Sequence, residues 1–271
     1  MSPVSSPSST PYIMEDPREG SRLEQKIDPD AWVEKYLEAH LFPGAQVLDV
    51  GCGPGTILRA ASSSARRFRG VGIDLGQNRV RQAQQKNADN AKLQFFRGDA
   101  QELEFESGTF DVVYARMLLQ YVPDKEKAVA EMVRVCKPGG KVLMQDLDGQ
   151  LVWHYPEDAL MQQTVTRVLR SLDPSGFDPF VGRKLFWLAR NAGLDNIKVQ
   201  VECYHLIAGA IDSEQFKHWE LKLEIAKPRM QAALGSDYEA AEEVRRFLSY
   251  LRRPDSLTYS NSFTVIGEKP K

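Results

Sequence analysis

Short apolar segments alternate with amphipathic segments along the middle of the chain. The apolar segments predict strands, because they have strand length and are bounded by turn-forming residues; they lie at 46–50, 70–74, 93–97, 110–115 and 141–145. Helical spacing between them predicts helices up to about residue 65, at 77–87 and at 124–136, with a Pro-Gly-Gly turn at 138–140. Buried strands that alternate with helices are typical of a parallel sheet covered on both faces, with right-handed crossovers.

The pattern changes on both sides of this core. Helical spacing predicts helices at 156–172, 181–192 and 211–251, the last in pieces broken near Pro228 and Gly235, with strands at 197–206 and 262–267. Before the core, residues 18–40 are predicted to be helical, with Pro29 in the first turn of a second helix. Residues 1–11 are rich in Ser and Pro and are predicted to be disordered, since they bury too little apolar surface to offset chain entropy.

Charge and cysteine content exclude several classes of protein. The 271 residues include 35 Lys and Arg against 37 Asp and Glu, a net charge of −2 at pH 7. A balanced charge argues against a nucleic-acid partner, and no apolar run approaches the about 18 residues that predict a membrane span. The cysteines form no Cys-x-x-Cys pair, so neither a zinc site nor an iron–sulfur cluster is expected. A reduced, cytoplasmic setting is predicted.

The first predicted strand leads into a glycine-rich loop. The segment is Val47-Leu48-Asp49-Val50-Gly51-Cys52-Gly53-Pro54-Gly55-Thr56, and a helix follows it. Glycines at alternate positions permit sharp turning and the close approach of a ligand to bare backbone. The start of the helix adds unpaired N–H groups and a partial positive charge. The segment therefore predicts a ligand-binding loop.

Several classes of ligand compete for such a loop. Dinucleotide folds prefer G-x-G-x-x-G, but Thr56 stands where the third glycine would be, and the Gly-Lys-Ser/Thr end of a phosphate loop is absent. A nucleoside without phosphate, with an amino-acid tail over the loop, fits better. The carboxylate of Asp49 would favour an ammonium or sulfonium group and oppose a pyrophosphate.

Two further acidic residues follow predicted strands. Asp74 ends the second strand, 21 residues beyond Gly53, which is the expected reach of a carboxylate to ribose hydroxyls. Asp99 follows the third strand and can accept a hydrogen bond from the exocyclic amine of adenine. Each could instead be a helix N-cap. Because both residues, like the loop, stand at the carboxyl end of a predicted strand, a nucleoside site at these strand ends is favoured.

As a set, these segments resemble the class I S-adenosylmethionine-dependent methyltransferases. The matching pieces, between about residues 45 and 150, are Val47 to Gly55, Gly72-Ile73-Asp74, Gly98-Asp99-Ala100, Phe110-Asp111-Val112-Val113 and Val135-Cys136-Lys137-Pro138-Gly139-Gly140. The resemblance implies a Rossmann-like α/β fold with a mostly parallel seven-stranded sheet, whose last strand is antiparallel, and helices on both faces. Residues 262–267 are the candidate last strand.

The flanks look like those of small-molecule methyltransferases from natural-product (secondary metabolite) pathways. The resemblance implies S-adenosyl-L-methionine as cofactor, S-adenosyl-L-homocysteine as product and a small-molecule substrate. It implies that Tyr12 covers the cofactor, that Arg22 meets its carboxylate and that Arg116 borders its methionine part. The full set of predicted cofactor-binding residues is Tyr12, Arg22, Asp49, Gly51, Cys52, Gly53, Gly55, Asp74, Leu75, Asp99, Ala100, Arg116 and Met117.

These implications divide the chain into functional parts. After the tail at 1–11, residues 12–42 are predicted to form cofactor-covering helices and residues 43–150 the cofactor-binding core. Residues 151–271 complete the sheet at about 181–206 and 260–268. They also contribute helical substrate-lid insertions, at about 151–178 and 209–258.

The acceptor side of the site is less strongly marked. A sulfonium methyl group is already activated, so an in-line displacement depends mainly on orientation and exclusion of water. His154 is the first candidate base, against the alternative of a histidine that packs on the insert; His218 is weaker. Asp146 and Asp148 form the only close carboxylate pair there, and capping of a loop is favoured over binding of magnesium.

Methyl transfer to a small, hydrophobic metabolite is the leading hypothesis. An alternative keeps the cofactor and the fold but catalyses a non-methylating step, such as a cyclisation, because no compelling base is present. A second alternative is a binding or regulatory module that uses the cofactor as a sensor, with the long insert as an interaction surface. The mass of the product distinguishes the first two, and binding without turnover would support the third.

Overall fold

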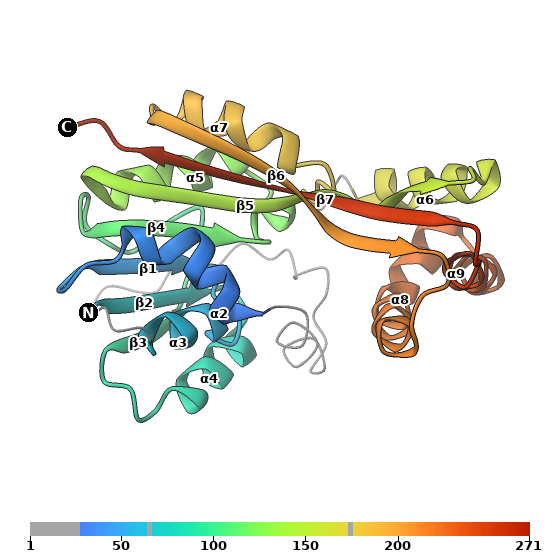
Figure 1. Ribbon diagram of the computed structural model, residues 1–271, viewed down its shortest axis with the longest axis horizontal. Helices are drawn as coiled ribbons and strands as arrows, with labels where there is room; N and C mark the ends of the chain where they lie inside the picture. Colours follow the sequence, from blue (N-terminus) through green and yellow to red (C-terminus); the bar gives the residue numbers. More distant parts are fainter. Residues whose placement is uncertain (1–27, 64–66, 173–175) are drawn as a thin grey trace.

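The protein is built on one mixed sheet with helices on both faces. A computed structural model describes residues 28–63, 67–172 and 176–271. The sheet has seven strands in the order β3-β2-β1-β4-β5-β7-β6. The last strand in sequence, β7, is antiparallel to both of its neighbours, and the pairs among β1 to β5 are parallel (Figure 1). The predicted mostly parallel sheet with an antiparallel last strand is therefore confirmed.

The core strands lie where the apolar pattern predicted them, but the last three strands are much longer. The strands are β1 (Gln46–Val50), β2 (Arg69–Asp74), β3 (Leu93–Arg97), β4 (Phe110–Arg116), β5 (Cys136–Tyr155), β6 (Asp195–Ala208) and β7 (Leu257–Glu268). The prediction of a short strand at 141–145 missed most of β5. The missed part carries polar residues, which the search for apolar runs does not detect.

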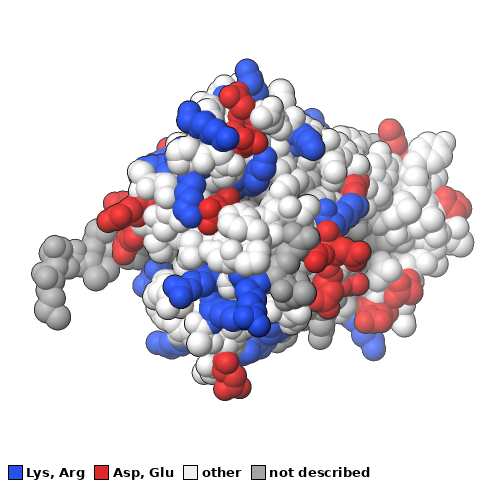
Figure 2. Space-filling model, turned by 60° about the vertical axis from the view of Figure 1, so that its left-hand side comes forward, with Lys and Arg blue, Asp and Glu red and all other residues white. Residues whose placement is uncertain are grey.

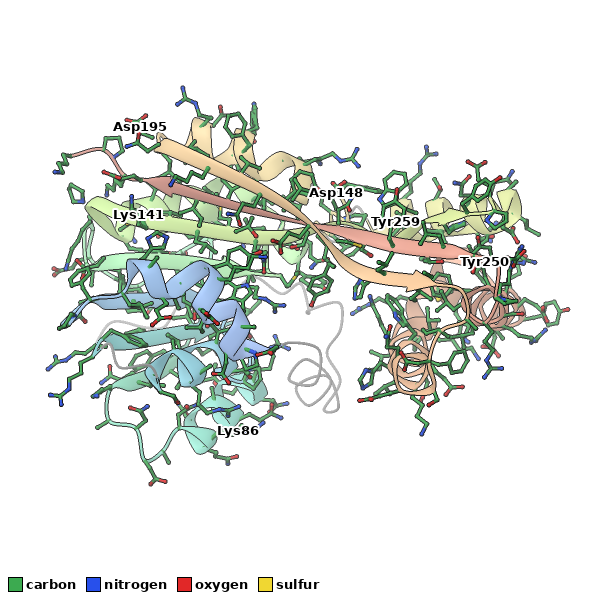
Figure 3. All side chains as sticks on the ribbon, in the orientation of Figure 1. Lys86, Lys141, Asp148, Asp195, Tyr250 and Tyr259 are labelled. Carbon is green, nitrogen blue, oxygen red and sulfur yellow. The ribbon has the colours of Figure 1, made fainter. Side chains whose placement is uncertain are left out.

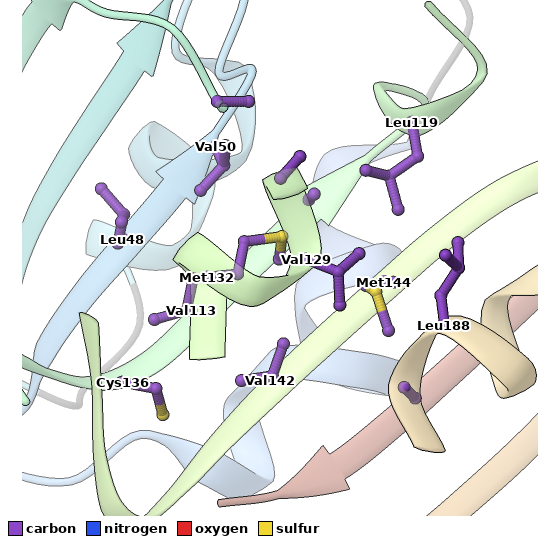
Figure 4. Packing of buried hydrophobic residues seen from close by; sticks show 14 of the residues in the cluster. Leu48, Val50, Val113, Leu119, Val129, Met132, Cys136, Val142, Met144 and Leu188 are labelled. Carbon is purple, nitrogen blue, oxygen red and sulfur yellow. The ribbon is translucent and has the colours of Figure 1, made fainter. Parts of the chain in front are cut away.

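Helices cover the two faces of the sheet with separate apolar cores. One core joins α5 (Lys125–Val135) and α7 (Leu185–Asn191) to the sheet and includes Met132 and Leu188 (Figure 4). The other face is covered by α2 (Pro29–Trp32) with the turns η1 (Val33–Leu37) and η2 (Glu38–His40), by α3 (Thr56–Ser62) and by α4 (Gln77–Lys86). This two-faced burial explains why the inner strands β1 and β4 are mainly apolar.

The outer parts of β5, β6 and β7 extend beyond this core and carry a helical lobe. The lobe contains α6 (Ala159–Leu172), α8 (Ser213–Leu234) and α9 (Asp237–Leu251) (Figure 1). Its own apolar cluster includes Ile207, Trp219 and Phe247. The lobe therefore has its own core and is joined to the rest by continuous strands.

The break predicted near Pro228 is wrong, since α8 continues through it. A proline removes one hydrogen bond and strains the preceding turn, but buried Trp219, Met230 and Leu234 hold the helix on both sides of it. The end predicted at Gly235 is confirmed, because this glycine has φ 79° and closes the helix in the left-handed conformation.

The surface carries charges of both signs. On the face shown in Figure 2, Lys and Arg side chains are interspersed with Asp and Glu. Among the described residues, no helix is both long enough and apolar enough to cross a membrane. The expectation that the protein binds neither nucleic acid nor membranes stays a prediction.

Candidate active site at the carboxyl ends of the strands

The glycine loop turns sharply between β1 and α3. Gly51, Gly53 and Gly55 all have positive φ, at 79°, 54° and 76°. A Cβ at Gly51 would lie 2.8 Å from Leu118 Cδ1, and one at Gly55 would lie 2.7 Å from the Phe95 ring. One at Gly53 would meet none of the described residues within 4 Å. Close packing therefore accounts for the outer glycines. Gly53 alone presents bare backbone to open space, as a cradle for a ligand requires.

Asp74 holds the loop in place from the end of β2. Its Oδ2 accepts a hydrogen bond from Gly53 N at 2.9 Å, and its Oδ1 accepts from Gly76 N at 2.8 Å and from Arg79 Nε at 2.9 Å. The residue is 8 % exposed. A carboxylate has further lone pairs, so contact with ribose hydroxyls stays a prediction.

Asp49 is a buried carboxyl directly before the loop. It is 3 % exposed and accepts a hydrogen bond from Tyr114 Oη at 2.8 Å. Burial raises its pKa to about 7, although the Tyr114 hydroxyl and the charge of Arg116 act in the opposite direction. Near neutral pH this carboxyl can therefore bind a cationic group by losing its proton.

The residues predicted beside the adenine have mainly local contacts. The carboxylate of Asp99 accepts a hydrogen bond from Gln101 N at 2.9 Å, and Ala100 packs in the core. The carbonyl of Leu75 accepts a hydrogen bond from Arg97 Nε at 3.1 Å. Their roles at the cofactor stay predictions, resting on their position after β2 and β3.

Cys52 is the loop residue whose side chain packs into the core. Burial raises the pKa of its thiol well above the ordinary value. A Cβ at Gly72 would lie 2.9 Å from Cys52 Sγ, so the thiol packs against β2. Only the backbone of Cys52 remains for the cofactor.

Arg116 ends β4 beside the loop, and Met117 follows it directly. Met117 has φ 53°, unusual for a residue with a side chain, and its N–H donates to Gln145 O at 2.8 Å. Arg116 Nη2 donates to Tyr204 Oη at 3.2 Å, whereas its buried Nε has no partner in the described parts of the chain. Tyr204 was missed from the sequence, because β6 reaches this site only through the order of the strands.

The N-terminal helix docks on the sheet next to this site. Trp32 Nε1 donates to Gln145 Oε1 at 2.7 Å, and Gln145 Nε2 donates to Thr264 Oγ1 at 2.7 Å. The Trp32 ring also packs on Tyr114, with centroids 5.6 Å apart. From the sequence, Trp32 is predicted only to lie in the helical segment 18–40. The predicted residues Tyr12 and Arg22 lie outside the described part of the chain.

Asp146 and Asp148 lie within β5 and not in a loop, so the predicted loop cap needs correction. Asp146 accepts hydrogen bonds from the backbone N–H of Gln120 and Leu147, and burial raises its pKa to about 7. Asp148 forms an ion pair with Arg183 at 2.7 Å, midway along the molecule in Figure 3. No cluster of three or more candidate metal ligands was found among the described residues.

His154 lies on the helical lobe, far from the glycine loop. It pairs with Thr258 across the sheet, and its ring lies 4.9 Å from that of Tyr250, which Figure 3 places on the lobe. It follows Gln145 by nine residues of the same strand, roughly 30 Å of extended chain. Burial lowers its pKa, so the ring is neutral. The structure does not bring His154 together with the predicted cofactor residues, and its catalytic role stays a prediction.

Residues 48–144 match the family model of the methyltransferase domain. This segment contains the glycine loop, the strand-end carboxylates and Arg116. It is a class I S-adenosylmethionine-dependent methyltransferase domain, and S-adenosylmethionine is its cofactor. The open backbone at Gly53 and the buried carboxyl of Asp49 fit the amino-acid end of such a ligand.

Several curated and solved proteins are similar to this chain in sequence or in fold. The chain is 34% identical over 187 residues to an uncharacterized 37.1 kDa protein in transposon TN4556 of Streptomyces fradiae, covering 65% of this chain and 52% of that one. It is 36% identical over 114 residues to demethylmenaquinone methyltransferase of Bacillus licheniformis, covering 41% and 49%. Phosphoethanolamine N-methyltransferase 2 of Haemonchus contortus, solved with S-adenosyl-L-methionine, has a similar fold, with a TM-score of 0.58 and 21% identity over 89% of this chain and 52% of that one. The chain spans about half the length of these curated relatives.

Proposed function

We propose that this protein transfers the methyl group of S-adenosylmethionine to a small, hydrophobic metabolite by in-line displacement. The observation that supports this most strongly is the bare backbone at Gly53 between two buried carboxyl groups, Asp49 and Asp74. The sequence similarity to a demethylmenaquinone methyltransferase supports an acceptor of small, apolar type.

The roles of the chain's own residues follow from their positions. When bound, the cofactor supplies a methyl group activated by its sulfonium. The carboxylate of Asp49 would bind the ammonium group of the amino-acid end, and Asp74 the ribose hydroxyls. Asp99 would accept from the adenine amine. Trp32 and its helix exclude water from the carboxyl ends of the strands, where the methyl group must meet its acceptor.

The composition of the helical lobe favours the proposal that the acceptor is bulky. Its cluster of aromatic and aliphatic side chains around Trp219 and Phe247 stands at the far end of the strands that also border the cofactor site. Apolar walls with a few polar groups are usual for sites that bind small molecules. The insertions at 151–178 and 209–258 would then act as the substrate lid.

Label transfer tests this function. The purified full-length chain would be incubated with methyl-labelled S-adenosylmethionine and a panel of quinols, sterols and phenolic metabolites. We expect at least one compound to gain label and the mass of one methylene group. Consumption of a compound without a change of mass would instead indicate a non-methylating reaction. Failure of the whole panel to gain label, with the cofactor bound, would count against methyl transfer.

A further inference from the structure

Buried hydroxyl groups line one face of β7, where a packed sheet usually places apolar side chains. They belong to Thr258, Ser260, Ser262 and Thr264, which alternate along the strand and therefore point to the same face. Their exposed fractions are 1%, 0%, 4% and 2%. Burial of a hydroxyl without a hydrogen-bond partner is unfavourable, so this face requires polar partners.

Some of these hydroxyls have partners and others do not. Thr264 accepts from Gln145 Nε2 at 2.7 Å, on the side of the N-terminal helix, and Ser260 Oγ lies 3.1 Å from His205 Nδ1, on the side of the helical lobe. Between them, the buried Oγ of Ser262 has no hydrogen-bond partner among the residues that the structure describes. Ser262 is thus an unpartnered polar side chain between the N-terminal helix and the lobe.

Arg116 and Tyr204 reach the same place from either side. Arg116 ends β4 and Tyr204 stands on β6, so their contact of 3.2 Å bridges over the intervening β5 and β7. The register places Arg116 beside Gln145, and Gln145 beside Thr264, on the face that carries Ser262. The guanidinium group therefore lies over the hydroxyl face.

A β-bulge directs Tyr204 toward this face. The register shifts between Cys203 and His205, and Tyr204 has no opposite residue on β7. Its ring consequently lies on the same side as that of His205, with centroids 4.6 Å apart, instead of on the opposite face. Bulges re-aim side chains in this way, often next to active sites.

The charges around Arg116 leave it able to bind an anion. The charge of Arg116 acts on the carboxyl groups of Asp49 on β1 and Asp146 on β5, and burial raises the pKa of both to about 7. These carboxyls therefore do not fully neutralise the guanidinium at neutral pH. The carboxylate of Glu202 on β6 is held by Lys35 and Tyr36.

We propose that Arg116, Tyr204 and Ser262 form the acceptor-binding site, and that the acceptor is a phenol or enol bound as its oxyanion; this rests on methyl transfer as the activity. Within the described part of the chain, neither Arg116 Nε nor the Ser262 hydroxyl has a hydrogen-bond partner, so both can donate to such an oxygen atom. Because Tyr204 occupies one end of the guanidinium fork, the remaining donors suit one oxygen atom better than a bidentate carboxylate.

The same arrangement explains how the acceptor ionises. A neighbouring cation favours the charged form of a hydroxyl and lowers its pKa. The hydroxyl proton then leaves to solvent before the methyl group moves, so no side chain has to accept it during transfer. An unactivated alcohol would need a base, and His154 lies on the lobe.

A coloured phenol tests this site directly. The full-length chain, saturated with S-adenosylhomocysteine, would be titrated with 4-nitrophenol, whose oxyanion absorbs visible light. We expect the bound probe to have a pKa at least about one unit below that of the free probe, a ten-fold shift toward the anion. Arg116→Gln should abolish the shift, while Arg116→Lys, which keeps the charge, should retain part of it.

Further variants separate binding from folding. Ser262→Ala and Tyr204→Phe should each weaken binding of 4-nitrophenol by about five- to ten-fold, the loss of one hydrogen bond, with the affinity for S-adenosylhomocysteine unchanged. Arg190→Gln, at an exposed ion pair on α7, is the matched control and should change nothing. If Arg116→Gln does not bind S-adenosylhomocysteine, the variants Ser262→Ala, Tyr204→Phe and Arg116→Lys still decide the outcome.

The possible outcomes are distinct. An equal probe pKa in the wild type and Arg116→Gln, no binding of 4-nitrophenol at millimolar concentration, or tighter binding of 4-nitrobenzoate than of 4-nitrophenol would each overturn the proposal. If the probe binds as its anion but no compound gains label, the anion site stands and methyl transfer fails. If label is transferred only to compounds without an acidic hydroxyl, methyl transfer stands and this site assignment fails.

Discussion

The hydroxyl group of Tyr114 donates a hydrogen bond to the buried carboxyl of Asp49, with the oxygen atoms 2.8 Å apart. The two residues are opposite each other on adjacent parallel strands, β4 and β1. Tyr114 is itself fully buried and packs against Trp32. The carboxyl that precedes the glycine loop is therefore fixed in position from within the core, before any ligand arrives.

Cofactor binding should release a proton from Asp49. Burial raises the pKa of this carboxyl to about 7, and an ammonium group beside it favours the ionised form. Below that pH we expect the affinity for S-adenosylmethionine to rise with pH, by up to about ten-fold per unit, and to level off above it. Calorimetry in buffers of different ionisation enthalpy measures the released proton directly.

Two variants assign that proton. Asp49→Asn should abolish its release, whereas Asp146→Asn should not, although burial raises the pKa of Asp146 to about 7 as well. Release that persists in Asp49→Asn would contradict the placement of the ammonium group at Asp49.

The same carboxyl should make the ligand-free protein less stable as pH rises. Between the ordinary value of 3.8 and about 7, folded Asp49 keeps a proton that the unfolded chain has lost. The free energy of unfolding should therefore fall across this window and become level above it. Urea unfolding at several pH values, compared between the wild type and Asp49→Asn, isolates this contribution; a fall of equal size in the variant would rule it out.

Gly53→Ala should remove cofactor binding at little cost to the fold. Both Gly53 and Gly44 have positive φ, and a Cβ at either would meet nothing within 4 Å. Alanine at each position should cost about 1–2 kcal/mol of stability through backbone strain. Only at Gly53 would the methyl group of the alanine enter the space of the ligand. Calorimetry should therefore show that Gly53→Ala has lost the binding of S-adenosylmethionine and that Gly44→Ala binds it normally. Equal affinities in both variants would be incompatible with a cradle at Gly53.

Trp32→Phe should destabilise the docking of the N-terminal helix. The change leaves the Gln145 side-chain oxygen buried without its donor, at a cost of about 1–3 kcal/mol in the free energy of unfolding. Trp187→Phe is the control, because Trp187 is 52% exposed and its replacement should change stability by less than about 0.5 kcal/mol. Denaturant unfolding of both variants makes the comparison, and equal stabilities would argue against this role of the indole.

Arg183→Gln should weaken the junction between the core and the helical lobe. Asp148 is 4% exposed and would lose its charged partner, although Arg183 N still donates to it. Because the Arg183 side chain is half exposed, we expect a loss of about 1–3 kcal/mol, less than for a fully buried pair. Arg190→Gln should cost less than about 0.5 kcal/mol, since its ion pair is exposed. Thermal unfolding that ranks the two variants in the opposite order would contradict this account.

The sequence predicted those parts of the fold in which burial decides the pattern. The strand at Gln46–Val50 and its parallel neighbours are buried on both faces, so they appear as apolar runs. The extension of β5 to Tyr155 was not predicted, because that part of the strand mixes charged and polar residues with aromatic ones. The helix through Pro228 was not predicted either, because packing of distant residues outweighs a local preference.

The candidate site likewise has a part that the sequence predicts and a part that it does not. Asp49, Gly53 and Asp74 lie at or just beyond the carboxyl ends of two strands, at fixed spacings along the chain, so the sequence places them together. Tyr204 and Ser262 join Arg116 only because the chain returns as β6 and β7 on the far side of β5. A signal for the hydroxyl face was nevertheless present in the alternation of Thr and Ser from Thr258 to Thr264, a strand pattern whose buried positions are polar.

A crystal structure of the full-length chain with S-adenosylhomocysteine tests the central claim most directly. The account predicts density over the backbone of Gly53, with the ammonium group within hydrogen-bond distance of Asp49 and the ribose hydroxyls at Asp74. Density for the ligand elsewhere on the protein, or a loop that stays empty at saturating ligand, would contradict it.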